Sequence, residues 1–335
     1  MRRVSHAVVG LLLATVGVVA ISLETLEPVR SVPPEIAGRF RDPRGFQQSA
    51  SGQYFVFDRR AHEMWGIDPR FDGPFRIVDI GGEPGRIIDP TSFAVAPDGT
   101  FVVADAPRGL ARIQSFTSAG FRTGGFFLEQ AGRPRITIDN TVMSGIGSMQ
   151  FTGRTVLLSQ PENGSLASEY TIGGQPTRSI GALRATGHEA DRDVHFALNS
   201  GIPLLAADGA LYYVFQAGLP VFRKYGRDGR LLFERQMQGL ELDAVVPALP
   251  ASWPRNPADG ELPLVRPSVR AATLDPKGRL WVAFDAGFTY VFDADGDKIR
   301  VVQFRGVGLV SPIAMFFGPT GRLLITPGLH EYEVD

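Results

Sequence analysis

Short runs of β-branched and aromatic residues recur along this chain, and each run follows a turn that ends in glycine. Six copies are present: SGQYFVFD from Ser51, PDGTFVVAD from Pro97, TGRTVLLSQ from Thr152, ADGALYYVF from Ala207, PKGRLWVAF from Pro276 and PTGRLLITP from Pro319. A repeat of roughly 40 to 55 residues, with room for four strands in each unit, is typical of a β-propeller blade. The repeats therefore predict an all-β fold, a six-bladed β-propeller.

Within each unit the hydrophobic pattern predicts four antiparallel strands. Apolar stretches before the glycine turns, such as 92–96 and 313–317, suit innermost strands, and the runs after the turns suit second strands. Third strands are expected at 64–68, 112–116, 168–172, 221–225, 289–293 and 330–334. A further glycine turn leads to a fourth strand in five of the six units, for example at 230–235 and 298–304.

The sixth unit has no fourth strand of its own, because the chain stops at Asp335. We expect residues 35–41 to supply this strand, since joining the two ends of the chain removes exposed sheet edges. The predicted organisation is a signal peptide or signal-anchor transmembrane helix at 1–23, a linker at 24–34 and the propeller at 35–335.

The N-terminal segment has the charge pattern of an export signal. Arg2 and Arg3 precede residues 4–23, which carry no formal charge, and Glu24 follows. The positive-inside rule then predicts an extracytoplasmic, periplasmic propeller. Cleavage after Ala20 would release it, whereas about twenty apolar residues at about 1.5 Å each just span the hydrocarbon, so a membrane tether is the other possibility.

Four small residues recur on one face of this segment if it is helical: Ala7, Gly10, Ala14 and Gly17. Such a stripe suits close packing against another membrane helix. The alternative is that export signals are simply rich in alanine and glycine.

Residues 90–120 resemble an NHL repeat of the six-bladed propellers. The resemblance rests on FAVAPDG from Phe93, VVAD from Val102 and RIQSF from Arg112, and residues 272–292 resemble the repeat as well. It covers most of the chain from about Ile36 onward, although blades three and four depart from the pattern after their glycine turns. Relatives include binding scaffolds, lyases and calcium-dependent lactonases, so the resemblance implies the fold and leaves the function open.

Charge and composition narrow the functional classes. The 34 basic and 35 acidic residues give a formal net charge of -1, without the positive field that nucleic-acid binding requires. The absence of cysteine excludes disulfides, thiolate metal sites and a cysteine nucleophile. Neither a Gly-x-Ser-x-Gly elbow nor a phosphate-binding Gly-x-x-x-x-Gly-Lys loop is present.

Loop length distinguishes the two faces of the predicted ring. Second-to-third turns and blade-to-blade connections lie on one face, which therefore receives the long connections 130–147, 181–201 and 237–266. Trp253, in a proline-rich loop that begins with a predicted short helix at 240–249, joins His62 and His330 as candidate partner-binding residues on this face. A loop packed on itself over a blade edge is the alternative.

One connection also carries candidate metal ligands, namely His188, Glu189, Asp191, Asp193 and His195. Imidazole and carboxylate groups are ligand types that zinc or manganese accepts. The alternative is a solvated loop in which Arg184 and Arg192 pair with the acids. Asp58, Asp105 and Asp285 end second strands, where a carboxylate is expected to cap the following turn.

Two functional classes remain. The favoured one is a non-catalytic extracytoplasmic propeller without a cofactor, which binds a protein partner at or in a membrane as a scaffold or accessory subunit. The other is a metal-dependent propeller hydrolase or lyase that acts on a small molecule and uses a divalent metal.

Overall fold

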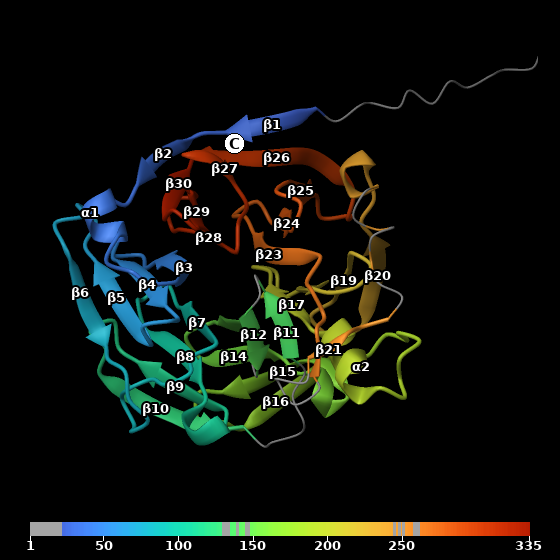
Figure 1. Cartoon of the computed structure of the whole chain (residues 1–335), viewed down its shortest axis with the longest axis horizontal. Coiled ribbons are helices and arrows are strands. Elements are labelled where there is room, and N and C mark those ends of the chain that lie inside the picture. The colour runs from blue at the N-terminus through green and yellow to red at the C-terminus, as the bar shows by residue number, and fades with distance from the viewer. Residues whose placement is uncertain are drawn as a thin grey trace, which may run out of the picture.

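The computed structural model describes residues 22–128, 135–138, 141–144, 148–243, 246, 249, 252–256 and 262–335. Six antiparallel blades surround a central axis, and the chain passes through them in order (Figure 1). The predicted six-bladed propeller is therefore confirmed. Because consecutive strands run from the axis outward, each blade contributes one strand to the channel wall.

The strands of each blade are described by their position from the axis outward. The innermost strands are β3 (Pro43–Gln48), β7 (Ser92–Val95), β13 (Met149–Phe151), β17 (Gly201–Leu205), β23 (Val269–Leu274) and β28 (Ala314–Phe317). The second strands are β4 (Tyr54–Asp58), β8 (Phe101–Asp105), β14 (Thr155–Ser159), β18 (Leu211–Phe215), β24 (Leu280–Phe284) and β29 (Leu323–Thr326). The third strands are β5 (Glu63–Ile67), β9 (Arg112–Phe116), β15 (Ser165–Thr171), β19 (Val221–Tyr225), β25 (Thr289–Phe292) and β30 (His330–Tyr332). The fourth strands are β6 (Pro74–Val78), β10 (Arg122–Phe127), β16 (Pro176–Ala182), β20 (Leu231–Gln236), β26 (Lys298–Gly306) and, from the N-terminal end, β2 (Pro28–Ser31).

The glycine turns and the apolar runs form these strands for separate reasons. The repeat glycines, for example Gly52 at φ 89° and Gly321 at φ 79°, adopt the left-handed conformation that closes a tight first-to-second turn. Every residue of β4, β8, β18 and β24 is buried, because neighbouring blades cover both faces of these strands. The core therefore lies between the blades, as where Phe55 and Phe101 meet.

The closing strand lies elsewhere than predicted. Instead of residues 35–41, β2 pairs antiparallel with β30, with Ser31 opposite His330. Residues 34–37 form the short helix α1 (Pro34–Ala37), in which Pro34 occupies the first turn. Proline lacks the N–H that a sheet ladder requires but is suited to the start of a helix, so Pro33 and Pro34 end the strand before residue 35.

The expected linker at 24–34 is instead built into the rim of the ring. Strand β1 (Leu23–Leu26) pairs parallel with β26, with Leu23 opposite Val301, and adds a strand to blade five. Strand β27 (Gly308–Val310) extends the other side of the same β26. Figure 1 shows β1 and β2 in blue along the red strands of the last two blades.

The connections on one face carry the remaining elements, and we call this the long-loop face. They are η1 (Pro107–Gly109), β11 (Arg135–Ile138), β12 (Thr141–Ser144), η2 (Pro161–Asn163), α2 (Arg192–Asn199), η3 (Leu240–Leu242), β21 (Arg255–Asn256) and β22 (Leu262–Pro263). Of the short helix predicted at 240–249, the described residues show only the turn η3.

No helix within the described ranges is both long enough and apolar enough to cross a membrane. Residues 1–21, including Ala7, Gly10, Ala14 and Gly17, lie outside those ranges.

Candidate functional site

The inner strands enclose two cavities that adjoin along the axis. The cavity at the long-loop face has a volume of about 160 Å³, and the one toward the opposite face about 640 Å³. The larger volume lies within the range of about 300–1,000 Å³ that is usual for small-molecule sites. Both cavities share the wall residues Gln47, Met149, Ile202, Ala272, Met315 and Phe316.

Three arginines line the smaller cavity, which we call the channel mouth. Arg44 comes from β3, Arg59 from the loop after β4 and Arg270 from β23. Asp42 accepts from both of the first two, with its Oδ1 2.7 Å from Arg44 Nε and its Oδ2 3.0 Å from Arg59 Nη2. Asp285 pairs with Arg270 Nε. Blades one and five, which are far apart in the sequence, thus place guanidinium groups at the same end of the channel.

These arginines were not predicted from the sequence, although one signal was present. Arg44 and Arg270 occupy the same register position relative to the turn glycines of their blades, Gly52 and Gly278. The second residue of both β3 and β23 is therefore an arginine at the start of an innermost strand.

In the connection to blade four, the candidate metal ligands bind the loop itself. Asp191 caps α2, accepting from Val194 N at 3.4 Å, and its other oxygen pairs with Arg255 Nη2 at 2.5 Å. Glu189 accepts from the backbone N–H groups of Thr186 and Gly187, and His195 Nδ1 lies 2.8 Å from Thr186 Oγ1. These contacts hold the turn that precedes α2.

The electrostatics of the loop agree with this structural role. Hydrogen bonds from the Thr186 and Gly187 backbone lower the pKa of Glu189, and the Arg255 guanidinium lowers that of Asp191. Among the described residues, which include all of 188–195, no group of three or more His, Asp or Glu side chains is placed to hold a metal ion. In this arrangement His188, Glu189, Asp191, Asp193 and His195 do not gather as one group, and metal binding by them stays a prediction.

The arginine that pairs with the acids of this loop is not one of the two predicted from the sequence. Arg255, rather than Arg184 or Arg192, pairs with the acids of this loop. The Arg184 guanidinium donates to the carbonyl oxygens of Leu198 and Ala217, each at 2.7 Å, and burial lowers its pKa to about 10. It thereby ties two connections of the long-loop face together.

Trp253 packs against this helix. It contacts the buried cluster of Val194, Ala197, Leu198, Ala217 and Val265. Trp253 is thus packed on a buried cluster, as the self-packed alternative expects, and its role in partner binding stays a prediction.

The two other candidate partner-binding residues each join segments at a blade junction. His62 Nδ1 accepts from Asp89 N at 3.4 Å, which links blade one to the connection that leads to blade two. His330 Nδ1 lies 2.7 Å from Ser31 Oγ, and burial lowers the pKa of this imidazole. Both histidines lie on the long-loop face, as predicted.

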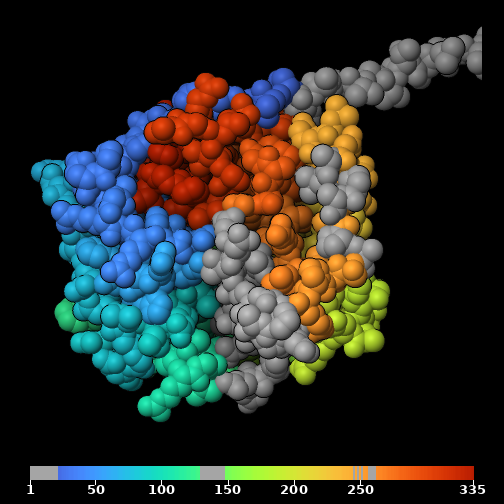
Figure 2. Space-filling model, in the orientation of Figure 1, coloured from blue at the N-terminus to red at the C-terminus, as the bar shows by residue number. Residues whose placement is uncertain are grey.

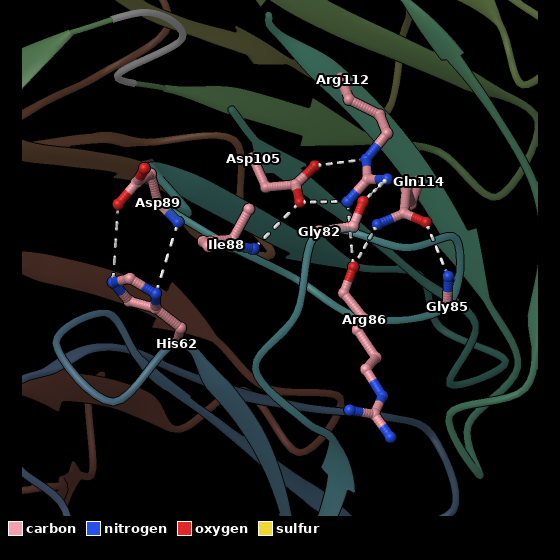
Figure 3. A network of polar contacts seen from close by, with 9 residues as sticks. All are labelled: His62, Gly82, Gly85, Arg86, Ile88, Asp89, Asp105, Arg112 and Gln114. Carbon is pink, nitrogen blue, oxygen red and sulfur yellow. Dashed lines mark hydrogen bonds and ion pairs between the residues drawn. The ribbon is translucent and has the colours of Figure 1, made fainter. Parts of the chain in front are cut away.

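A buried polar network anchors the connection between blades one and two (Figure 3). Asp105 forms a two-point ion pair with Arg112, at 2.9 and 2.6 Å, and accepts from Ile88 N. Arg112 also donates to the carbonyl oxygens of Gly82 and Arg86. Burial raises the pKa of Asp105, and the bonds from Arg112 and Ile88 oppose this rise.

The predicted capping of the following turn is seen for one of the three strand-end aspartates. Asp58 caps the turn that follows its strand, because its Oδ1 accepts from Ala61 N at 3.1 Å, and it also accepts from Arg41 N and Asp42 N in the preceding loop. Asp105 binds a different connection, since it accepts from Ile88 N ahead of blade two. Asp285 instead pairs with Arg270 at the channel mouth.

No protein-family model and no curated protein matches the chain. Among solved structures, the chain is similar to the selenomethionine-substituted virginiamycin B lyase from Staphylococcus aureus, with 14% identity and a TM-score of 0.50 over 85% of this chain and 77% of that one. It is also similar to a streptogramin B lyase, with 12% identity and a TM-score of 0.52 over 88% and 93%. At this identity the similarity shows the fold alone, and the likeness to NHL repeats stays a resemblance.

Proposed function

We propose that this chain is a non-catalytic extracytoplasmic propeller that binds a protein partner at or in a membrane, as a scaffold or accessory subunit. The observation that carries the proposal is the position of β1. This strand begins at Leu23, where the apolar run of residues 4–23 ends. A retained N-terminal segment would therefore join the rim of blade five without a flexible linker.

The contacts of β1 support a firm attachment. Arg300 donates from Nε and Nη2 to the Glu24 carboxylate at 2.7–3.0 Å, and Arg305 Nη1 lies 3.4 Å from Glu27 Oε1. Strand β2 then continues along blade six. A membrane helix ahead of β1 would hold the rim of blades five and six near the bilayer. The long-loop face would then be left free to bind a protein partner.

The experiment is the intact mass of the protein purified from native membranes in mild detergent, with co-purifying proteins identified. A full-length chain with stoichiometric partners is the expected result. A chain trimmed near Ala20 that runs alone would overturn the proposal. Gly10→Ile, on the small-residue stripe, should reduce partner recovery, whereas Leu12→Ile, which falls on the opposite face if the segment is helical, should not.

The alternative is a propeller hydrolase or lyase acting on a small molecule. A central cavity of ligand size and the similarity to structures described as lyases favour it. The metal content of the purified chain tests the metal-dependent form of this reading. Stoichiometric metal that is lost in His195→Ala but kept in His62→Ala would favour the enzyme over the scaffold.

A further inference from the structure

The larger cavity, of about 640 Å³, lies toward the face opposite the long-loop face, and we call it the wider cavity. Its wall is mainly apolar, although several polar residues belong to it. Gln47 Oε1 accepts from Val95 N at 2.8 Å, and Gln150 Oε1 accepts from Leu205 N. Asp275 accepts from Trp281 Nε1 at 3.1 Å and from Arg279 N at 2.8 Å. Because these groups already bond within or between the blades, an occupant would meet mainly side chains such as Ile202, Leu204, Met315, Phe316 and Phe317.

The channel mouth has the opposite chemistry. Its described lining contains Arg44, Arg59 and Arg270 and no acidic side chain. Asp42 and Asp285, which pair with these arginines, do not line the cavity. The arginine side chains are only 14–18% exposed, so their charges act close to the cavity with limited solvent screening.

We propose that the axial channel binds a small amphipathic anion, with a carboxylate at the channel mouth and an apolar chain or ring in the wider cavity. A guanidinium presents five planar N–H donors, which match a carboxylate in charge and geometry. Each of the three arginines already has partners, so the ligand shares these donors or displaces a carboxylate. Asp285 is the carboxylate most readily displaced, because its side chain is 51% exposed and water can hydrate it once the ligand binds Arg270.

Burial of the ligand's two ends favours different parts of the channel. An apolar chain gains free energy in proportion to the area it removes from water, which the wider cavity provides. A carboxylate removed from water requires charged hydrogen-bond donors, which only the mouth provides within the described lining. The arrangement therefore selects molecules with one anionic end. The channel mouth lies at the long-loop face, which also carries the candidate partner-binding residues, whereas the wider cavity lies toward the opposite face.

Binding of octanoate tests the inference. Equilibrium dialysis of radiolabelled octanoate against the full chain in lipid nanodiscs, with empty nanodiscs as the blank, should give one site per chain. Octanol, which lacks the charge, and octylammonium, which reverses it, should each compete at least about tenfold more weakly, because charged hydrogen bonds contribute the difference.

Variants locate the site. Arg270→Gln and Arg44→Gln should each weaken octanoate binding by about tenfold or more. Ile202→Trp, at the shared wall of the two cavities, should block the apolar chain. Arg86→Gln is the matched control, because Arg86 pairs with the exposed Glu83 on the same face and lies outside the channel lining.

Four results would overturn the inference: no octanoate binding, equal competition by octylammonium, equal competition by octanol, or unchanged affinity in both arginine variants whose circular dichroism is native. Recovery of the membrane partner is scored in a separate preparation, so the proposed function can stand when this inference fails, and the reverse.

Discussion

The Nδ1 atom of His330 lies 2.7 Å from the Oγ atom of Ser31, and this contact joins residues that are 299 positions apart in the chain. It sits where β2 pairs with β30, so the last blade is completed by residues from the other end of the molecule. The Tyr54 hydroxyl, in blade one, also bonds to Glu331 of this strand. The ring is therefore closed by side chains as well as by the backbone ladder.

Acidification should weaken this closure through His330. Burial lowers the pKa of His330, so the folded state favours the neutral imidazole. Its contribution to the free energy of unfolding is present above the usual imidazole pKa of about 6.5 and is lost as the pH falls through the lowered value. Urea denaturation between pH 5 and 8 should show a shallower pH dependence for His330→Asn than for the wild type. Equal slopes for His330→Asn and the wild type would contradict this assignment.

Truncation should separate the two roles of the N-terminal region. A chain lacking residues 1–21 keeps β1 and β2 and should melt at the temperature of the full chain. A chain lacking residues 1–32 exposes the edges of β26 and β30, and its melting temperature should fall by several degrees, at about 2–4 °C per kcal/mol. Differential scanning calorimetry measures both. A common melting temperature would show that the rim strands contribute nothing to closure.

Removal of Arg112 should be strongly destabilising. Arg112→Met leaves Asp105 buried without its charged partner and removes donors from two loop carbonyls, which costs about 3–5 kcal/mol. Arg86→Gln, which breaks only an exposed pair with Glu83, should cost less than about 1 kcal/mol. Chemical denaturation gives both values.

The same variant should respond to pH. Because the pKa of Asp105 is raised by burial, the stability linked to its protonation is present below the usual carboxyl value and lost as the pH rises through the raised one. Arg112→Met should therefore recover part of its lost stability on acidification. A deficit that is constant across pH would contradict an uncompensated carboxylate.

Asp191 should control the packing of Trp253 on α2. Asp191→Ala removes the helix cap and the ion pair with Arg255, at a cost of about 1 kcal/mol. Red-shifted Trp253 emission, identified by subtraction of Trp253→Phe, would report the loosened loop. Asp193→Ala is the matched control, because Asp193 lies 3.7 Å from Arg255 and does not cap the helix.

In the wild type the same loop should loosen in acid. The pKa of Asp191 is lowered by Arg255, so its stabilising contribution is present above the usual carboxyl pKa and is lost as the pH falls through the lowered value. The change in Trp253 emission should therefore appear only in strongly acidic solution. Its absence in Asp191→Ala would confirm that Asp191 carries it.

The local sequence pattern was sufficient to predict the strands and turns of the blades. The third strands β9 (Arg112–Phe116) and β19 (Val221–Tyr225) have the predicted bounds, and the repeat glycines adopt the predicted turns. Hairpins form between neighbouring segments, so turn residues and apolar runs specify them without reference to the rest of the chain. The face that carries the long connections was also predictable, because the number of antiparallel strands in a blade decides on which face each connection lies.

Contacts between segments that are distant in the sequence could be identified only from the tertiary structure. Pairing of β2 with β30 and of β1 with β26 depends on which N-terminal residues reach the last blades, and a short strand of four residues carries little local signal. The acids near α2 have metal-ligand chemistry, yet the helix cap and Arg255 use them. Arg44 and Arg270 meet at one opening because ring closure brings blades one and five around a common axis. Residue type and spacing specify hairpins, whereas a site shared by distant blades depends on the geometry of the closed ring.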